Sequence, residues 1–366
     1  MGDGGDYAAL VDQPRAVRAG EEIDAQALDA FLARALPELA GALTVEQFPR
    51  GFSNLTYLVV KGGREMVLRR PPRGAAIKSA HDMGREHRIL SALAPLYPKA
   101  PRPLAYCEDP SVLGAPFYLM ERVHGVILRG GASTAALDQG ARRAVSEALV
   151  DALAELHALD HRRPGLAALG HGEGYVERQV TGWTARYQAA RTGDVPAMER
   201  VARWLHAHRP PASDLALIHN DFKHDNVVLD PDGIDRVVAV LDWEMATVGD
   251  PLMDLGTTLA YWVDPDDPPA FRAAGFVDVT TQPGSLRRRE AAERYARATG
   301  RNLSRLPFYY AFGLFKVAVI AQQIYARFRG GHTKDPRFAH LDAAVAACAA
   351  AAARVAEAGR IDGLGI

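Results

Sequence analysis

Acidic, basic and amide side chains gather in one short segment of the chain. Asp221, Lys223 and Asn226 lie within the run 218–230, and Asp242 follows shortly after it. Phosphoryl transfer needs a carboxylate at the acceptor hydroxyl, oxygen ligands for Mg²⁺ and cations against the phosphates. These residues supply all three requirements. The segment therefore predicts a Mg²⁺-dependent phosphoryl-transfer site.

Each of these four residues has an expected role. Asp221, between an apolar run and a β-like run, would take the hydroxyl proton as the catalytic base. Asn226 and Asp242 would bind the metal through their side-chain oxygens, and Lys223 would reach the γ-phosphate as a mobile charge. The competing interpretation is a turn rich in Asp and Asn that only caps its neighbours. It is disfavoured because four different side chains fit one chemistry.

A hairpin is expected to position the metal ligands. The β-like runs 226–230 and 236–241 are joined by Pro231-Asp232-Gly233, which is typical of a turn. Asn226 begins the first run and Asp242 ends the second. We therefore expect the two side chains to approach the same ion.

The chain before residue 124 is expected to open with a short amphipathic helix and to form an antiparallel sheet followed by one helix. Two β-rich runs meet at Gly62-Gly63, a strong hairpin signal, and residues 80–93 carry apolar positions at helical spacing. A proline-rich connector and a β-like run lead to Gly125, an expected interlobe hinge. The expected elements are helix 24–35, strands 55–60 and 65–70, helix 80–93 and strand 116–120.

Beyond residue 124 apolar positions recur mainly at helical spacing. Helices are expected over 137–159, 176–191, 196–207, 286–299, 305–329 and 335–358. We therefore predict an α+β fold with two lobes: an N-terminal nucleotide-binding lobe, 1–123, built on an antiparallel sheet, and a larger, mainly helical C-terminal lobe, 124–366. The catalytic loop and the acceptor-binding region fall in the second lobe, and the site is expected in the cleft between the two.

The run from His219 to Asn226 resembles the protein-kinase catalytic loop in order and spacing, with Asp242 in the place of the kinase metal-binding Asp. Trp243-Glu244 follow Asp242 where kinases have Phe-Gly. The segment DPLMDL, 250–255, begins only a few residues later, so there is no room for an activation loop. The chain therefore resembles the aminoglycoside phosphotransferase and choline kinase superfamily of protein-kinase-like fold. It is most similar to the subgroup related to the kinase-like domain of some acyl-CoA dehydrogenases, through VLRRPP, AHDMGREHRIL, HNDFKHDNVVLD and LDWEMATVGDPLMDLG.

The resemblance implies that ATP or GTP is the co-substrate and that the first lobe binds it. The turn 48–57 occupies the place of the phosphate loop with a single glycine, so Gly51, Ser53 and Asn54 are the expected phosphate contacts. Arg69 stands where kinases carry the strand lysine, and Glu86 is its expected partner. An Arg can serve both carboxylate and phosphate through its planar fork.

Other positions are also assigned by the resemblance. Glu121 and Val123 would offer backbone groups to the nucleotide base. His219 would pack beneath the catalytic loop, and Asp254 would brace that loop from the start of a helix.

Composition limits the partners. Lys and Arg together number 43 against 44 Asp and Glu, so no global field favours nucleic acid or an anionic membrane. The sequence contains no uninterrupted apolar run of about 18 residues, so we predict no membrane span. The first residues are acidic and carry no leader-like segment, and Cys107 and Cys348 are far apart. We expect a cytoplasmic protein without a disulfide.

Three further groups of charged residues have plainer explanations. The acidic loop 264–267 could rim the acceptor site, but a solvated turn is favoured. Arg287-Arg288-Arg289 is followed by acidic residues on one predicted helix, which favours an ordinary charged face. His157 fits helix packing better than zinc binding.

The sequence as a whole predicts a small-molecule kinase that uses an alcohol group as phosphoryl acceptor. The resemblance favours a hydroxyacyl group or its CoA thioester as acceptor. An aminoglycoside or another antibiotic is the second choice. A catalytically inactive, nucleotide-binding pseudokinase is the alternative of another class.

Overall fold

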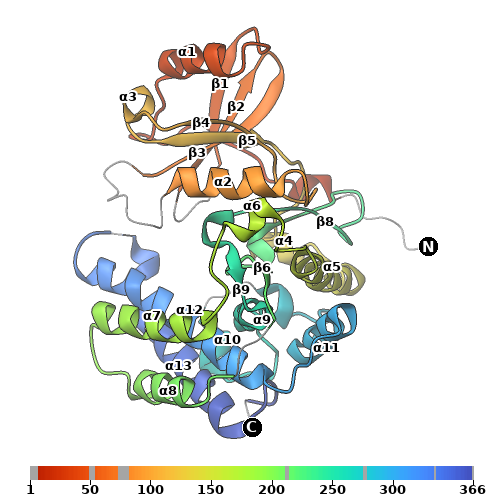
Figure 1. Ribbon diagram of the computed structural model, residues 1–366, viewed down its shortest axis with the longest axis vertical. Coiled ribbons are helices and arrows are strands. Elements are labelled where there is room, and N and C mark those ends of the chain that lie inside the picture. Colours follow the sequence, from red (N-terminus) through yellow and green to blue (C-terminus); the bar gives the residue numbers. More distant parts are fainter. Residues whose placement is uncertain are drawn as a thin grey trace. The chain divides into compact units, whose positions relative to one another are not determined.

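The computed structural model describes residues 7–48, 54–72, 82–210, 214–274, 278–333 and 335–364. The chain divides into two compact units. The first comprises Met1–Ile127 and Asn226–Ala246, and the second comprises Leu128–Asp225 and Thr247–Ile366. Antiparallel strands dominate the first unit and helices the second (Figure 1), which confirms the predicted α+β class.

A five-stranded antiparallel sheet forms the centre of the first unit. Its strand order is β1-β2-β3-β5-β4, with β1 Leu43–Gln47, β2 Leu55–Lys61, β3 Arg64–Arg70, β4 Pro103–Cys107 and β5 Phe117–Glu121. The predicted Gly-Gly turn joins β2 to β3, and both glycines have positive φ, 58° and 79°. That conformation suits a two-residue hairpin because its twist matches the twist of the strands.

Two helices cover opposite faces of this sheet (Figure 1). On one face, alternate residues such as Tyr57, Leu68 and Phe117 pack with Leu28 and Leu32 of α1, Ala25–Ala35. On the other lies α2, Met83–Leu93, against β4 and β5. The strand period of two explains why so much of β2 and β3 is buried on both sides. Short helices α3 Pro110–Leu113 and η1 Ala8–Leu10 also belong to this unit.

The predicted hairpin from the middle of the chain is part of the first unit. Its strands are β7, Val227–Leu229, and β8, Val237–Val240, followed by the short helix η3, Trp243–Met245. Val126 and Leu229 exchange two backbone hydrogen bonds of 2.9 and 2.8 Å. The Val240 N–H donates to the carbonyl of Lys99 at 2.7 Å. These bonds attach the hairpin to the sheet-bearing unit.

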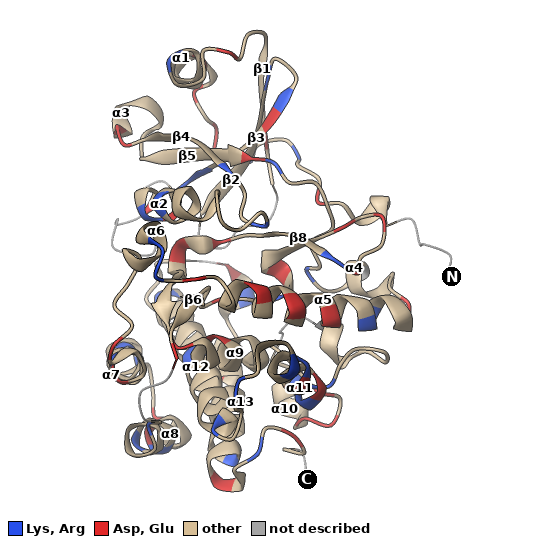
Figure 2. Cartoon of the chain, turned by 45° about the vertical axis from the view of Figure 1, so that its right-hand side comes forward, with Lys and Arg blue, Asp and Glu red and all other residues tan. Residues whose placement is uncertain are grey.

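The second unit is a packed set of helices with one two-stranded sheet, β6 Ala216–Ile218 paired with β9 Thr247–Gly249. Its longer helices are α5 Gln139–His157, α7 Tyr175–Ala190, α8 Pro196–Ala207, α9 Pro251–Ala260, α11 Arg288–Thr299, α12 Leu306–Arg329 and α13 Leu341–Ala358. Short elements are α4 Ala132–Ala135, α6 Pro164–Ala167, η2 His224–Asn226, which reaches the boundary of the two units, α10 Pro269–Arg272, η4 Asp278–Thr281 and η5 Pro336–Phe338. In Figure 2 a basic segment lies near the start of α5, and acidic segments follow one another along the rest of the helix.

Helices α9 and α12 approach closely at two glycines. A Cβ atom on Gly313 would collide with the backbone of Gly256, and a Cβ on Gly256 would collide with the backbone of Tyr309. Small residues at a helix crossing let the two backbones come together. The close approach fixes α12 beside the middle of α9.

One stretch, Pro336–Ala358, is long and apolar enough to cross a membrane by length and composition alone. Half of its apolar window is buried inside the protein, and its helix α13 packs on α12 and α8. A core helix of this composition meets the same criterion.

The acidic loop at 264–267 was expected to be a solvated turn, but two of its acidic residues are buried. Asp264 and Asp267 are buried, and both face Arg288, whose side chain has 0% exposure. Arg288 also donates to the carbonyls of Trp262 and Ile361. The prediction of an ordinary charged face is therefore wrong for Arg288, because its two neighbours Arg287 and Arg289 alone reach solvent.

Both cysteines are free thiols, as predicted, and both are buried.

Candidate active site

Asp254 braces the loop that follows β6, as predicted. It lies in the first turn of α9 and is fully buried. One carboxylate oxygen accepts the N–H of His219 and the other accepts the N–H of Asn220, both at 2.7 Å. A carboxylate that receives two adjacent backbone donors fixes the direction in which the chain leaves the strand. His219 is buried below the loop, as expected.

His157 of α5 completes this support. Its Nε2 lies 3.1 Å from Oδ2 of Asp254, and its Nδ1 lies 2.7 Å from the hydroxyl of Tyr295. Burial lowers the pKa of His157. Burial alone would raise the pKa of Asp254, but the hydrogen bonds and charges of His157 and His219 hold it below its ordinary value. His157 is thus a packing residue, as predicted.

Asp221 and Lys223 come together directly after the braced residues. Lys223 Nζ lies 3.0 Å from Oδ2 of Asp221, and their side chains are 21% and 18% exposed. The hydroxyl of Tyr261 donates to Oδ1 of Asp221 at 3.1 Å, and Lys223 also lies 4.9 Å from the centre of the Tyr261 ring. Burial would lower the pKa of Lys223, but Tyr261, Asp221 and Asp225 raise it well above its ordinary value. The loop thus presents a partly exposed carboxylate beside a cation.

Tyr261 is a site residue that the sequence reasoning did not find. It follows the last residue of α9, forty positions after Asp221. Nothing in the local spacing distinguishes it from a packing aromatic. Its place in the site depends on how α9 returns from Asp254 towards the loop.

In the first unit, Arg69 binds two carboxylates. Its Nη1 lies 2.5 Å from Oε1 of Glu86, which is the predicted ion pair, and its Nη2 lies 2.9 Å from Oδ1 of Asp242. Arg69 and Glu86 are both buried, whereas the Asp242 side chain is 29% exposed. Burial raises the pKa of Glu86, and the charge of Arg69 opposes this. The fork of Arg69 joins helix α2 to the residue expected to bind the metal.

Helix α2 also holds the backbone after Asp242. Oε1 of Glu86 accepts the N–H of Trp243 at 3.1 Å, and Arg85 donates to the carbonyls of Glu244 and Ala246 at 3.1 and 2.8 Å. Asp242 itself has φ 68°, a left-handed conformation that is uncommon for a residue with a side chain. Such conformations persist only where the surroundings enforce them.

Asn226 and Asp242 are brought close along the hairpin. The carbonyl of Asn226 accepts the N–H of Leu241, the residue before Asp242, at 2.8 Å. An amide oxygen and a carboxylate are ligands that suit Mg²⁺. The chemistry of these two side chains therefore suits a magnesium ion. Among the described residues, no group of three or more His, Cys, Asp and Glu side chains is arranged to hold a metal.

The predicted phosphate turn is only partly described. Gly51 and Ser53 lie outside the described residues, whereas Asn54 is buried and donates to Oε2 of Glu244 at 3.0 Å. Burial, together with the charge of Asp242, raises the pKa of Glu244 to about 8. Glu244 was not singled out by the sequence, because one Glu after a Trp gives no signal of its own.

The expected base-binding residues lie at the end of β5. The N–H of Glu121 donates to the carbonyl of Arg102 at 2.9 Å, and its side chain accepts the N–H of Arg102. Val123 lies past the end of the strand and is half-buried. The backbone of Glu121 is therefore already paired within the sheet.

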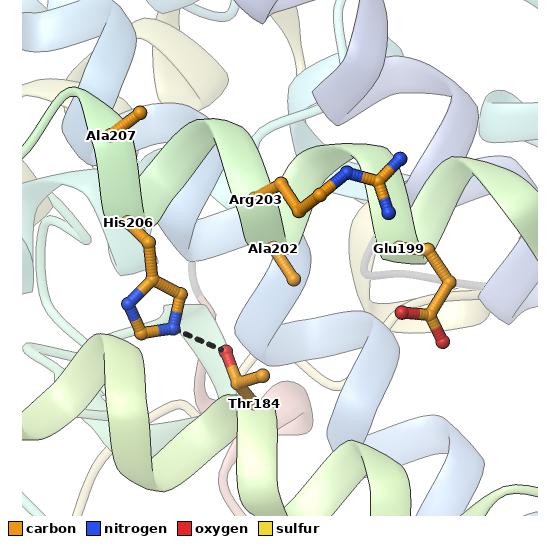
Figure 3. A pocket seen from close by; sticks show the side chains of 6 residues that line it. All are labelled: Thr184, Glu199, Ala202, Arg203, His206 and Ala207. Carbon is orange, nitrogen blue, oxygen red and sulfur yellow. Dashed lines mark hydrogen bonds between the residues drawn. The ribbon is translucent and has the colours of Figure 1, made fainter.

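A hollow of about 470 Å³ lies between α7 and α8 in the second unit. Figure 3 shows Glu199, Arg203 and His206 from α8 around it, with His206 near the hydroxyl of Thr184 from α7 at 3.5 Å. None of the residues predicted for the site lines this hollow.

Comparison with known proteins identifies relatives over most of the chain. The sequence profile of the phosphotransferase enzyme family matches residues 44–309. Acyl-CoA dehydrogenase family member 11 of Gallus gallus is 39% identical over 328 residues, which cover 86% of this chain and 41% of that protein. The Homo sapiens protein of the same name is 37% identical over 322 residues, or 86% and 40%. The chain thus spans about two fifths of the length of these relatives.

Solved structures share the fold. A protein of Ralstonia eutropha, provisionally assigned as an aminoglycoside phosphotransferase, is 32% identical with a TM-score of 0.76, covering 92% of this chain and 99% of its own. Macrolide 2'-phosphotransferase type I is 22% identical, with a TM-score of 0.60 and coverage of 90% and 97%. Aminoglycoside phosphotransferase APH(4)-Ia, in a ternary complex with AMP-PNP and hygromycin B, is 19% identical, with a TM-score of 0.58 and coverage of 88% and 99%. The last two show a common fold. The resemblance stated from the sequence is confirmed.

Proposed function

Because the chain belongs to the phosphotransferase enzyme family, we propose that it transfers the γ-phosphoryl group of ATP or GTP to a hydroxyl group of a small molecule. The observation that carries this proposal is the setting of Asp221. Its carboxylate is partly exposed. One carboxylate oxygen accepts a hydrogen bond from the hydroxyl of Tyr261, and the other forms an ion pair with Lys223. Asp254 braces the backbone just before it. A general base needs such an oriented, accessible carboxylate.

In this reaction Asp221 accepts the proton of the acceptor hydroxyl. The hydroxyl oxygen forms a bond to the γ-phosphorus while the bond from that phosphorus to the β–γ bridging oxygen breaks, and the nucleoside diphosphate leaves. Lys223 offsets negative charge on the transferred group, and Arg69 does so on the nucleotide phosphates. Asn226 and Asp242 would hold Mg²⁺, which would neutralise phosphate charge when bound.

For the acceptor, we favour a hydroxyacyl group or its CoA thioester. The support is the kinship with proteins named acyl-CoA dehydrogenase family members 11 and 10, which match 86% and 87% of this chain. Because the chain spans only about two fifths or less of those proteins, their names bear on the acceptor's chemical class and not on a dehydrogenase reaction here.

An antibiotic acceptor is the second candidate. It is favoured by the Ralstonia eutropha structure, which is 32% identical. Binding a polycationic aminoglycoside requires uncompensated carboxylates around the acceptor. In the acidic loop 264–267, Asp264 and Asp267 are buried against Arg288, and Asp266 pairs with Arg287. This loop therefore offers no uncompensated carboxylates to a polycation.

Thermal melts and product release together test the proposal. We expect ATP or GTP to raise the melting temperature more with Mg²⁺ than without it. ADP or GDP release is then followed with hydroxybutyryl-CoA, kanamycin, hygromycin B and erythromycin as acceptors. We expect turnover with hydroxybutyryl-CoA.

Three variants locate the chemistry. Asp221→Asn should lower kcat by about 10²–10⁴-fold and keep the nucleotide-induced melting shift. Asp242→Asn should lose the Mg²⁺-dependent part of that shift. Asp266→Asn, an exposed carboxylate paired with Arg287, is the matched control and should behave as wild type. Full activity of Asp221→Asn would refute the assignment, and nucleotide binding without turnover on any acceptor would indicate a pseudokinase.

A further inference from the structure

A buried lysine donates a hydrogen bond to the backbone carbonyl of the residue that precedes the proposed catalytic base. Lys316, in the middle of α12, has 2% exposure. Its Nζ donates to the backbone oxygen of Asn220 at 2.5 Å and lies 5.6 Å from the ring centre of Trp183 in α7. Asp221 forms its ion pair with Lys223. Among the described residues, no ion pair includes Lys316.

Asn220 is held from three directions in an uncommon conformation. Its φ is 69°, in the left-handed region, which Asn tolerates better than most residues. Its N–H donates to Asp254, its side-chain oxygen accepts the hydroxyl of Tyr175 at 3.0 Å, and its carbonyl accepts Lys316. Because Asn220 and Asp221 share a peptide bond, these contacts determine where the Asp221 side chain begins.

Burial of the charged lysine at this position is energetically unfavourable. Burial lowers the pKa of Lys316 from its ordinary value of 10.5 to about 8, Asp221 and Asp254 act in the opposite direction, and Lys223 and Arg186 add to the lowering. These groups belong to the catalytic loop, α9 and α7, which pack around it. An apolar side chain of similar length would avoid this desolvation. A costly buried cation next to a reacting group is typical of a functional position.

We propose that Lys316 is a positioning residue for phosphoryl transfer, which holds the Asn220 carbonyl and thereby orients the Asp221 carboxylate towards the acceptor hydroxyl. The inference rests on the proposed function, because Asp221 has its role only there. Lys316 touches neither acceptor nor nucleotide in this proposal. Its action passes through the peptide between residues 220 and 221.

The chain offers matched variants for a test. Lys316→Met removes the ammonium and keeps the length, Lys316→Arg keeps a cation, and Gln322→Met is the control. Gln322 lies on the same helix, is buried, and donates to Ala190 and Thr192 at 2.9 and 3.0 Å. Among the described residues, neither of its hydrogen-bond partners belongs to the catalytic loop. All four proteins are assayed with hydroxybutyryl-CoA and ATP, and ATP hydrolysis without acceptor is measured in parallel.

We expect Lys316→Met to lower kcat by about 100-fold, the size of effect that misplacement of a catalytic group causes, with unchanged KM for ATP. Its melting temperature should not fall, because the buried charge is gone. The wild-type kcat should decline above pH about 8, where Lys316 loses its proton, whereas Lys316→Arg should keep its rate there. Lys316→Met should lack this decline. A wild-type kcat in Lys316→Met, or equal losses in Gln322→Met, would overturn the proposal.

A crystal structure of Lys316→Met separates this inference from the proposed function. We expect the Asn220 carbonyl to turn away and the hydrogen bond from Tyr261 to Asp221 to break. If wild type releases no ADP with any acceptor, the proposed function fails, yet the crystal structure still decides whether Lys316 positions Asp221. An unchanged loop in that structure contradicts the positioning role. If the Met variant does not fold, the pH profiles of wild type and Lys316→Arg decide.

Discussion

The hydroxyl of Tyr261 donates a hydrogen bond of 3.1 Å to Oδ1 of Asp221. A hydrogen bond to a charged group contributes about 1.5–3 kcal/mol, which corresponds to about 10–100-fold in rate if it is needed in the transition state. Tyr261→Phe removes only this oxygen and should lower kcat within that range, with nucleotide affinity retained. Steady-state kinetics and nucleotide titration measure the two quantities. Tyr325→Phe removes an equivalent hydroxyl from Asp342 and should leave kcat unchanged; equal rates in both variants would deny Tyr261 any role in the reaction.

Asp254 is expected to contribute to both stability and activity. An Asn at this position keeps one oxygen acceptor and turns an amide group towards the second N–H, which leaves a buried donor unsatisfied. We expect Asp254→Asn to lose about 3 kcal/mol of unfolding free energy in urea titrations. The folded pKa of Asp254 is lowered, so its contribution is present above the ordinary carboxyl pKa and is lost as pH falls towards the folded value. A stability difference between wild type and variant that does not shrink in acid would contradict this.

Arg288 and Arg287 are adjacent and should respond differently to the same substitution. Arg288→Met leaves Asp264 and Asp267 buried without their cation, which should cost about 3–5 kcal/mol. Arg287 is 49% exposed and pairs with exposed Asp266, so Arg287→Met should change stability by less than about 1 kcal/mol. Denaturant unfolding of both variants measures the contrast. Similar values for the two would mean that burial of Arg288 has no energetic weight.

The crossing of α9 and α12 depends on glycine. Gly313→Ala places a methyl group against the backbone of Gly256 and Thr257, and we expect a loss of about 1–3 kcal/mol. Gly182, within α7, has open space around its Cβ position. Gly182→Ala should therefore stabilise the protein by about 0.5–1 kcal/mol through helix propensity. Thermal melts of the pair should move in opposite directions, and a melting temperature for Gly313→Ala at or above that of wild type would disagree with the packing described.

The depressed pKa of Lys316 predicts a stability that rises at alkaline pH. Between about 8 and the ordinary 10.5 the unfolded chain keeps the lysine proton that the folded chain has released. Because the unfolded state binds more protons there, unfolding free energy increases with pH through this window. The gain from this lysine alone is on the order of 3 kcal/mol. It is measured as the difference between wild type and Lys316→Met, and a difference that is flat from pH 7 to about 10.5 would argue against a lowered pKa.

Local patterns were sufficient for several of the elements and for part of the site. The Gly-Gly turn, the helical spacing of 80–93 and the run from His219 to Asn226 each carry their information within a few residues, so hairpin, helix and loop follow from the sequence. Asp254 and the pair of Arg69 with Glu86 were found because a resemblance supplied the long-range partner.

Other contacts could not be predicted, because nothing local marks the partner. Tyr261 is an aromatic residue after a helix, and Glu244 is one acid after a tryptophan. Arg288 lies between two exposed arginines. It is buried because the distant segment 264–267 and Ile361 pack against it. Side chains of this kind acquire their roles only when distant segments of the chain pack together.

The hairpin of β7 and β8 completes a unit whose other part ends at Ile127. During synthesis the ribosome makes 128–225 before it reaches this hairpin, a delay on the order of ten seconds. Until then the nascent sheet lacks the backbone partners of Val126 and Lys99, and α2 lacks the segment with Trp243. Until these residues are made, the N-terminal part lacks these partners, which favours aggregation or chaperone capture. A stand-alone fragment will need residues 226–246 fused behind Ile127.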